Sequence, residues 1–226
     1  MLKVAREFFH LPENERLKCF SDDPLKTTRL ATSFNVKTEA VSSWRDYLRL
    51  HCYPLEDYMH EWPSNPPSFR EDVAEYCRNV KGLAKRLLEA ISESLGLEKN
   101  YLNRALGKHG QHMAINYYPP CPQPELTYGL PGHADPNVVT LLLQDEVAGF
   151  QVFNHGRWVA VKPMPHTFIV NIGDQMQERI RPVTQSEPVM MSFVYAELRH
   201  ALTQDSRYKV KLTRMYHLAC MTNKCG

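Results

Sequence analysis

The hydrophobic and polar positions follow two different periods along the chain, and the first period predicts helices. A long segment opens with Ser68 and, three residues later, Glu71, a capping box directly after a Pro-Pro pair. Apolar side chains then recur at steps of three and four, at Val73, Tyr76, Cys77, Val80, Leu83, Ala84, Leu87 and Ile91. This spacing predicts one long amphipathic helix with a single buried stripe. Upstream, residues 1–20 favour two short helices, and the alternating, aromatic segment 44–55 favours a strand.

From residue 111 onward the pattern changes to short runs rich in Val, Ile and aromatic residues. The runs are QHMAINYY, NVVTLLLQ, GFQVF, RWVAV and HTFIVNI. Proline-rich breakers and an Asn-His-Gly turn at 154–156 separate them, which is typical of strands joined by tight turns. Five or more strands after a helical front half predict an α+β fold, a β-sandwich or jelly roll braced by helices.

Composition narrows the range of partners. The chain has 226 residues, 43% of them hydrophobic, with a formal net charge of +2, and its basic residues are spread out. We therefore expect no nucleic-acid partner and no binding to anionic membranes. No apolar run approaches the ~20 residues of a membrane span, and the start carries no apolar leader. The six cysteines form no CxxC pair, which favours reduced thiols over a zinc or disulfide framework. We expect a cytoplasmic monomer.

The stretch GHADPNVVTLLLQD, residues 132–145, places two metal-ligating side chains next to an apolar run. In extended backbone residues i and i+2 project to the same side, so His133 and Asp135 are expected to point together. An imidazole and a carboxylate on one face make two thirds of the 2-His-1-carboxylate triad that holds Fe(II). The third ligand must then come from a distant strand. A solvated loop pair is the alternative that these two residues alone leave open.

Most of residues 1–177 resembles a known family. The phrases INYYPPCPQPELTYGLPGHADPNVVTLLLQD, GFQVFNHGRWVAVKPMPHTFIVNIGDQMQ, SFNVKTEAVSSWRDYLRLHCYPLEDYMHEWPSNPPSFRE and LLEAISESLGLE are similar to plant 2-oxoglutarate and Fe(II)-dependent dioxygenases, in particular the salicylate hydroxylase and flavone synthase-like branch. The resemblance implies a double-stranded β-helix, or jelly roll, which holds iron in its open mouth and carries helices outside.

The resemblance also implies roles for individual residues. His133 and Asp135 match two of the iron ligands, and Asn116 and Tyr118 match positions near the 2-oxoglutarate. For the last two, the alternative is a capped strand end beside a proline turn. The remaining candidates are expected to be structural or at the surface: Gly173 and Asp174 in a turn between strands, and His112, His155 and His166 as surface or hydrogen-bonding histidines.

The implied activity is the hydroxylation or desaturation of a small phenolic of the salicylate or flavonoid type, in plant secondary metabolism. The cofactors implied are Fe(II) and 2-oxoglutarate, with ascorbate as a further candidate. Oxygen would be activated at a His-x-Asp…His iron site, and a mostly apolar barrel interior suits a small aromatic substrate.

Residues 178–226 depart from the family's pattern. The family continues into a second iron-binding histidine, followed ten residues later by an Arg-x-Ser that anchors 2-oxoglutarate, and this segment contains neither feature at that spacing. LTQDSRYKV, residues 202–210, resembles the phrase that precedes this histidine, as if residues 178–201 were inserted. On that alignment His217 is the nearest replacement ligand, and His200 is a weaker one.

The segmentation expected from these observations has three parts. Residues 1–107 form the helical N-terminal region with its start missing, residues 108–177 a partial jelly-roll core, and residues 178–226 a divergent tail. Both ends of the family's chain are expected to be missing. The alternative function is a catalytically inactive relative that lacks the second iron histidine and the Arg-x-Ser anchor.

Overall fold

The computed structural model describes residues 1–33, 39–176, 209–213 and 218–220. The chain folds into two compact units. The first unit contains residues 1–81 and 108–131, and the second contains residues 82–107 and 132–220.

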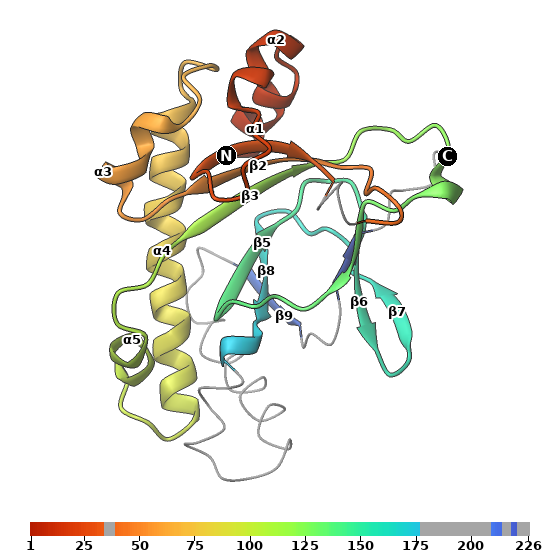
Figure 1. Ribbon diagram of the computed structural model, residues 1–226. Helices are drawn as coiled ribbons and strands as arrows, with labels where there is room; N and C mark the ends of the chain where they lie inside the picture. Colours follow the sequence, from red (N-terminus) through yellow and green to blue (C-terminus); the bar gives the residue numbers. More distant parts are fainter. Residues whose placement is uncertain (34–38, 177–208, 214–217, 221–226) are drawn as a thin grey trace. The chain divides into compact units, whose positions relative to one another are not determined.

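The first unit is a three-stranded antiparallel sheet with helices against it (Figure 1). Its elements are α1 (Leu2–Phe9), α2 (Glu13–Arg16), η1 (Leu17–Cys19), β1 (Thr28–Thr32), β2 (Asp46–His51), α3 (Leu55–Tyr58), η2 (Met59–Glu61), the start of α4 (Phe69–Ser94), β3 (His112–Tyr117) and η3 (Pro124–Leu126). The strand order is β1-β2-β3, and Leu48 in the middle of β2 lies opposite Leu30 of β1 and Ile115 of β3. The predicted short helices and the predicted strand in segment 44–55 are confirmed.

One face of this sheet forms the core of the first unit. Alternate residues of β2 point to it, and Leu48 and Leu50 are fully buried there. They pack in one cluster with Val4, Phe8, Phe9, Leu30, Cys52, Trp62, Phe69, Val73, Ala74 and Cys77. Because β2 alternates, Tyr47 and Arg49 project to the opposite face, which carries the polar residues discussed below.

The predicted long helix is α4, and its predicted stripe is buried or partly buried, with Val73, Leu87 and Ile91 at most 1% exposed. Its start differs from the predicted capping box. The Ser68 hydroxyl donates to the carboxylate of Asp72 at 2.9 Å, one residue beyond the expected partner. A carboxylate in the first turn still lies where the helix macrodipole favours negative charge.

The second unit contains two small sheets. Its elements are the end of α4, α5 (Tyr101–Leu106), β4 (Leu130–His133), β5 (Val139–Leu143), β6 (Phe150–Asn154), β7 (Arg157–Ala160), β8 (Thr167–Ile172), β9 (Lys209–Thr213) and β10 (Leu218–Cys220). The strand orders are β4-β10-β6-β7 and β5-β8-β9. All five strands predicted from residue 111 onward are confirmed, and the fold is α+β as predicted.

Side chains from both sheets share one core. Phe150 and Val152 of β6 cluster with Ile169 of β8 and Val161, and Leu142 of β5 packs against them. The hairpin between β6 and β7 turns at His155 and Gly156, which have φ of 47° and 76°. Two successive positive φ angles are the mark of a type I′ turn, whose twist matches that of the flanking strands.

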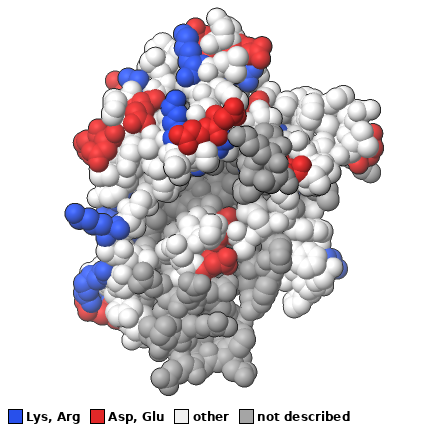
Figure 2. Space-filling view, viewed as in Figure 1, with Lys and Arg blue, Asp and Glu red and all other residues white. Residues whose placement is uncertain are grey.

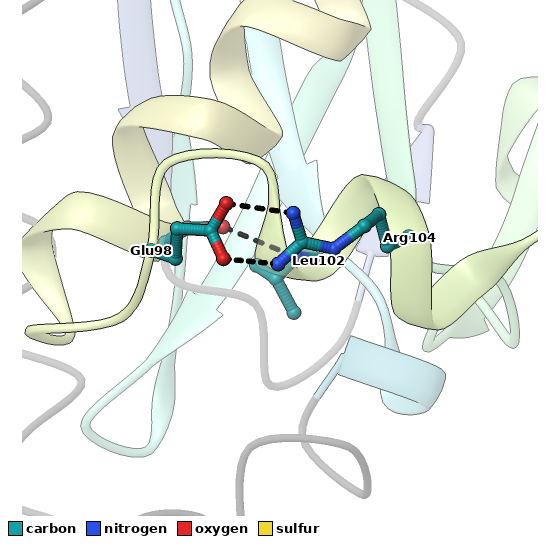
Figure 3. A network of polar contacts seen from close by, with 4 residues as sticks. Glu98, Leu102 and Arg104 are labelled. Atoms are coloured by element: carbon teal, nitrogen blue, oxygen red, sulfur yellow. Dashed lines mark hydrogen bonds and ion pairs between the residues drawn. The ribbon is translucent and has the colours of Figure 1, made fainter.

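The short helix α5 is tied to the segment that follows α4. Figure 3 shows the guanidinium of Arg104 facing the carboxylate of Glu98, with Nη1 donating to Oε1 at 2.7 Å and Nη2 to Oε2. The backbone N–H of Leu102 donates to the Ser92 hydroxyl at 3.2 Å. Leu102 is 3% exposed, whereas the two charged side chains are more than half exposed. Burial of Leu102 therefore contributes more to the position of α5 than the ion pair does.

Candidate metal site

His133 and Asp135 lie together, as the strand geometry predicted. His133 is the last residue of β4, and its Nε2 lies 3.5 Å from Oδ1 of Asp135. The His133 side chain is 38% exposed and that of Asp135 is 14% exposed. The pair thus presents an accessible imidazole next to a mostly buried carboxylate.

The carboxylate of Asp135 is held as an anion. Burial alone would raise its pKa, but hydrogen bonding with His133 and Thr140 outweighs burial, and the pKa of Asp135 lies below its usual value. Asn171 acts in the same direction. Thr140 and Asn171 lie directly opposite each other on β5 and β8. Two neighbouring strands therefore supply polar groups to one acidic side chain.

One oxygen of this carboxylate is left without a partner. Oδ2 of Asp135 is buried and accepts no hydrogen bond from the residues that the structure describes. An unpaired buried acceptor costs about 1 to 3 kcal/mol, so such an atom usually has a ligand, an ion or a water to satisfy it. A cation bound by the carboxylate would provide that partner.

The donor set fits a divalent transition metal. Imidazole and carboxylate ligands lie about 2.1 Å from zinc. At that bond length, two donor atoms lie about 3.0 Å apart when the donor–metal–donor angle is 90°, and about 3.4 Å apart when the angle is 109°. The observed 3.5 Å lies close to this range. Within the described ranges, no group of three or more His, Cys, Asp or Glu side chains could hold a metal. The predicted third ligand, His217, lies outside the described residues, as does the weaker candidate His200.

Asn116 and Tyr118 belong to the first unit, whereas His133 and Asp135 belong to the second. Asn116 projects from β3 on the exposed, polar face of its sheet, and Tyr118 directly follows that strand and is half-buried. Their predicted place near the cosubstrate, and hence their proximity to the metal pair, stays a prediction.

A buried arginine that the sequence analysis missed holds Asn116. Arg45 is 7% exposed, and its Nη1 donates to Oδ1 of Asn116 at 3.2 Å. Its Nη2 donates to the carbonyl of Ser33 at 3.0 Å, and its guanidinium lies 4.5 Å from the ring centroid of Tyr47. Of the described carboxylates, none contacts Arg45 in a salt bridge. Asn116 thus lies next to a fixed positive charge.

Asn171, Thr140 and Arg45 were not predicted as parts of the site, and the sequence pattern pointed to them to different degrees. Asn171 is the one polar residue inside the apolar run FIVNI, and a polar residue at 1% exposure usually has a specific partner. Thr140 similarly interrupts an apolar run. Arg45 carried no such signal, because its contact with Asn116 depends on the pairing of β2 with β3.

The three histidines that were predicted to lie at the surface do so. His112, His155 and His166 are all exposed. His112 faces His51 across β3 and β2, with ring centroids 4.3 Å apart and planes at 89°. Burial, followed by the charge of Arg49, lowers the pKa of His112, and burial, followed by the charge of His112, lowers the pKa of His51.

Charged residues of both signs are interspersed on the face seen in Figure 2, which shows no block of a single sign among the atoms coloured there. No helix among the described residues is both long and apolar enough to cross a membrane.

Comparison with known families identifies the family to which the chain belongs. Residues 109–209 match the 2OG-Fe(II) oxygenase superfamily, and residues 1–68 match the N-terminal region described as non-haem dioxygenase in morphine synthesis. The first match contains His133, Asp135, Asn116 and Tyr118. The chain belongs to the plant 2OG/Fe(II) dioxygenase family. The resemblance drawn from the sequence is therefore confirmed.

Relatives within this family are close over most of the chain. Protein DMR6-LIKE OXYGENASE 1 of Arabidopsis thaliana is 68% identical over 177 residues, which are 78% of this chain and 51% of the relative. Flavanone 3-dioxygenase 2 of Oryza sativa subsp. japonica is 60% identical over 178 residues, 78% of this chain and 52% of the relative. The chain spans about half the length of these curated relatives.

Solved structures agree with the family. The crystal structure of JOX2 in complex with 2OG, Fe and JA aligns with a TM-score of 0.72 at 40% identity, over 77% of this chain and 53% of that one. The predicted jelly-roll class is confirmed by this neighbour. These comparisons give no support to the alternative of a catalytically inactive relative.

Proposed function

We propose that this chain carries the metal-binding part of a 2-oxoglutarate- and Fe(II)-dependent dioxygenase that hydroxylates or desaturates a small phenolic. The observation that supports it most directly is the His133–Asp135 pair with its buried, unpartnered carboxylate oxygen. An imidazole and a carboxylate at 3.5 Å suit a metal of this class, and the depressed pKa of Asp135 keeps the carboxylate ionised, as a metal ligand must be.

Each residue of the site has a part in this function. His133 Nε2 and the Asp135 carboxylate would hold Fe(II), and a third ligand would come from residues 178–226, with His217 as the candidate. Fe(II) and 2-oxoglutarate together supply the oxidising power, because oxidative decarboxylation of the keto acid drives the reduction of O₂. Asn116, fixed by Arg45, and Tyr118 would orient the cosubstrate carboxylate through hydrogen bonds.

The proposed substrate class is supported by the names of two relatives. Flavanone 3-dioxygenase 2 at 60% identity and a naringenin,2-oxoglutarate 3-dioxygenase of Callistephus chinensis at 43% identity favour a flavonoid. We propose a flavanone first, and salicylate second. Ascorbate as an accessory reductant, the cytoplasmic location and the monomeric state stay predictions.

The test is an anaerobic titration of the purified chain with Fe(II), with and without 2-oxoglutarate, followed by visible absorption. A saturable charge-transfer band that requires both components and disappears in Asp135→Ala is the expected result. Aerobic assays with naringenin and with salicylate should then give succinate in proportion to product. A folded sample that shows neither Fe(II) binding nor a band would overturn the proposal. As a control, His155→Ala should leave the band unchanged, because His155 is an exposed turn residue.

A further inference from the structure

The loop that carries Asp135 is held by the chain segment that follows β8. We call residues 173–175 the clasp. Its three backbone N–H groups all donate to carbonyls of residues 135–138: Asp174 to Asp135 at 2.9 Å, Gly173 to Val138 at 3.1 Å and Gln175 to Asn137 at 3.2 Å. The loop lies between β4 and β5 and has no helix or strand of its own. Its backbone position therefore depends on the clasp.

The first residue of the clasp can only be glycine. A Cβ placed on Gly173 would lie 2.1 Å from the carbonyl oxygen of Asn137 and 2.6 Å from its side-chain Oδ1. The nearer atom is backbone, so no side-chain rotation relieves the overlap, and the loop itself would have to move. The contact with Asn137 lies two residues from Asp135, so that movement would reach the carboxylate.

Asn171 of β8 also acts on this carboxylate, because its side chain helps to lower the pKa of Asp135. Asn171 lies in β8, two residues before Gly173, and is 1% exposed. Its Oδ1 accepts no bond from any described residue, whereas its amide N–H₂ group is the part that can donate to an acceptor such as a carboxylate. Thr140 lies opposite it and accepts a hydrogen bond from Nδ2 of Asn137 at 2.9 Å. The loop that carries Asp135 is thus held both by backbone hydrogen bonds from the clasp and by the side chain of Thr140.

We propose that Gly173 and Asn171 are positioning residues that fix Asp135 in the geometry required for metal binding. The inference rests on the proposed function, in which Asp135 is a metal ligand. Ligands need supporting groups that hold them within about 0.5 Å of the productive position, and removal of such groups typically weakens metal binding by about 10- to 100-fold. Neither residue would touch the metal, so both act through Asp135.

The test is the Kd for Fe(II), measured anaerobically by calorimetry on the whole chain. Gly173→Ala is compared with wild type and with Gly82→Ala, a matched control in the same unit, because a Cβ on Gly82 meets no atom within 4 Å. We expect Gly173→Ala to raise the Kd at least about tenfold and to shift the charge-transfer band, with Gly82→Ala unchanged. A purely structural role for Gly173 would lower the thermal midpoint of the metal-free chain and leave the Kd unchanged.

Asn171→Ala keeps the inference testable if Gly173→Ala does not fold. It is expected to raise the Kd by about tenfold while the far-UV circular dichroism stays that of wild type. If wild type and Gly82→Ala bind Fe(II) and the folded variants bind within about threefold of them, the positioning role is wrong and the proposed function stands. If wild type itself binds no Fe(II), both the positioning role and the proposed function are wrong.

Discussion

Two tryptophans of the first unit make nearly the same hydrogen bond in different surroundings. Nε1–H of Trp62 donates to the carbonyl of His51 at 3.1 Å, and Nε1–H of Trp44 donates to the carbonyl of Pro119 at 3.0 Å. Trp62 is 1% exposed, whereas Trp44 is 38% exposed. Replacing each by Phe therefore removes the same donor from a buried and from a partly exposed site.

The expected losses of stability differ because water can reach the carbonyl of Pro119 beside the partly exposed Trp44 more easily than the carbonyl of His51 beside the buried Trp62. At Trp62 the carbonyl of His51 would lose its partner in a part-buried position, which costs about 1 to 3 kcal/mol. The smaller ring would also leave part of a fully buried site empty, at about 1 to 2 kcal/mol more. We expect Trp62→Phe to lower the free energy of unfolding by about 2 to 5 kcal/mol and Trp44→Phe to lower it by less than about 1 kcal/mol.

Urea denaturation followed by far-UV circular dichroism measures both losses under one set of conditions. A loss of about 2 to 5 kcal/mol would be a large part of a total that is about 5 to 15 kcal/mol for most domains. Equal losses for the two variants would refute the argument that burial decides the value of this bond. A larger loss for Trp44→Phe would do so as well. The slope of the transition should stay that of wild type, since neither change alters the surface exposed on unfolding by much.

Three further predictions concern charge and turn chemistry. The pKa of His51 and that of His112 are both lowered in the folded chain, so the unfolded chain binds more protons just below pH 6.5. The contribution of these two histidines to the free energy of unfolding should therefore be fully present above about pH 6.5 and decline as the pH falls through the folded-state pKa values. Urea midpoints at about pH 7.5 and about pH 5.5 should thus differ in wild type and differ less in the double variant His51→Gln/His112→Gln, and an unchanged pH dependence would contradict this. Gly156→Ala should cost about 1 kcal/mol, seen as a lower thermal midpoint, because φ of 76° is strained for alanine although open space surrounds the site; no loss would argue against the type I′ turn. Glu98→Gln should leave the midpoint within about 1 °C, because its partner Arg104 is exposed, and a clear drop would mean that the ion pair matters more than the burial beside it.

Local patterns in the sequence were enough to predict the elements and the pair at the centre of the site. Steps of three and four predicted α4, and short apolar runs predicted β3, β5, β6, β7 and β8, because periodic burial is a property of neighbouring residues. The proximity of His133 to Asp135 followed from the same local geometry. The sequence did not predict β1, β4, β9 or β10. β1 has few apolar residues, and β4 contains both proline and glycine, which weaken any local strand signal.

Other features were decided only when distant segments met. Asn116 and Arg45 are 71 residues apart, and they touch because β2 pairs with β3. Gly173 reads as an ordinary turn glycine in the sequence, yet the carbonyl of Asn137 occupies the place of its missing side chain. The burial that leaves one oxygen of Asp135 without a partner is likewise set by the strands around it. The sequence by itself thus determined which residues could bind a metal. Only the tertiary structure decided which residues hold them in place, because those contacts join segments that are distant in the sequence, and the local hydrophobic pattern carries no information about them.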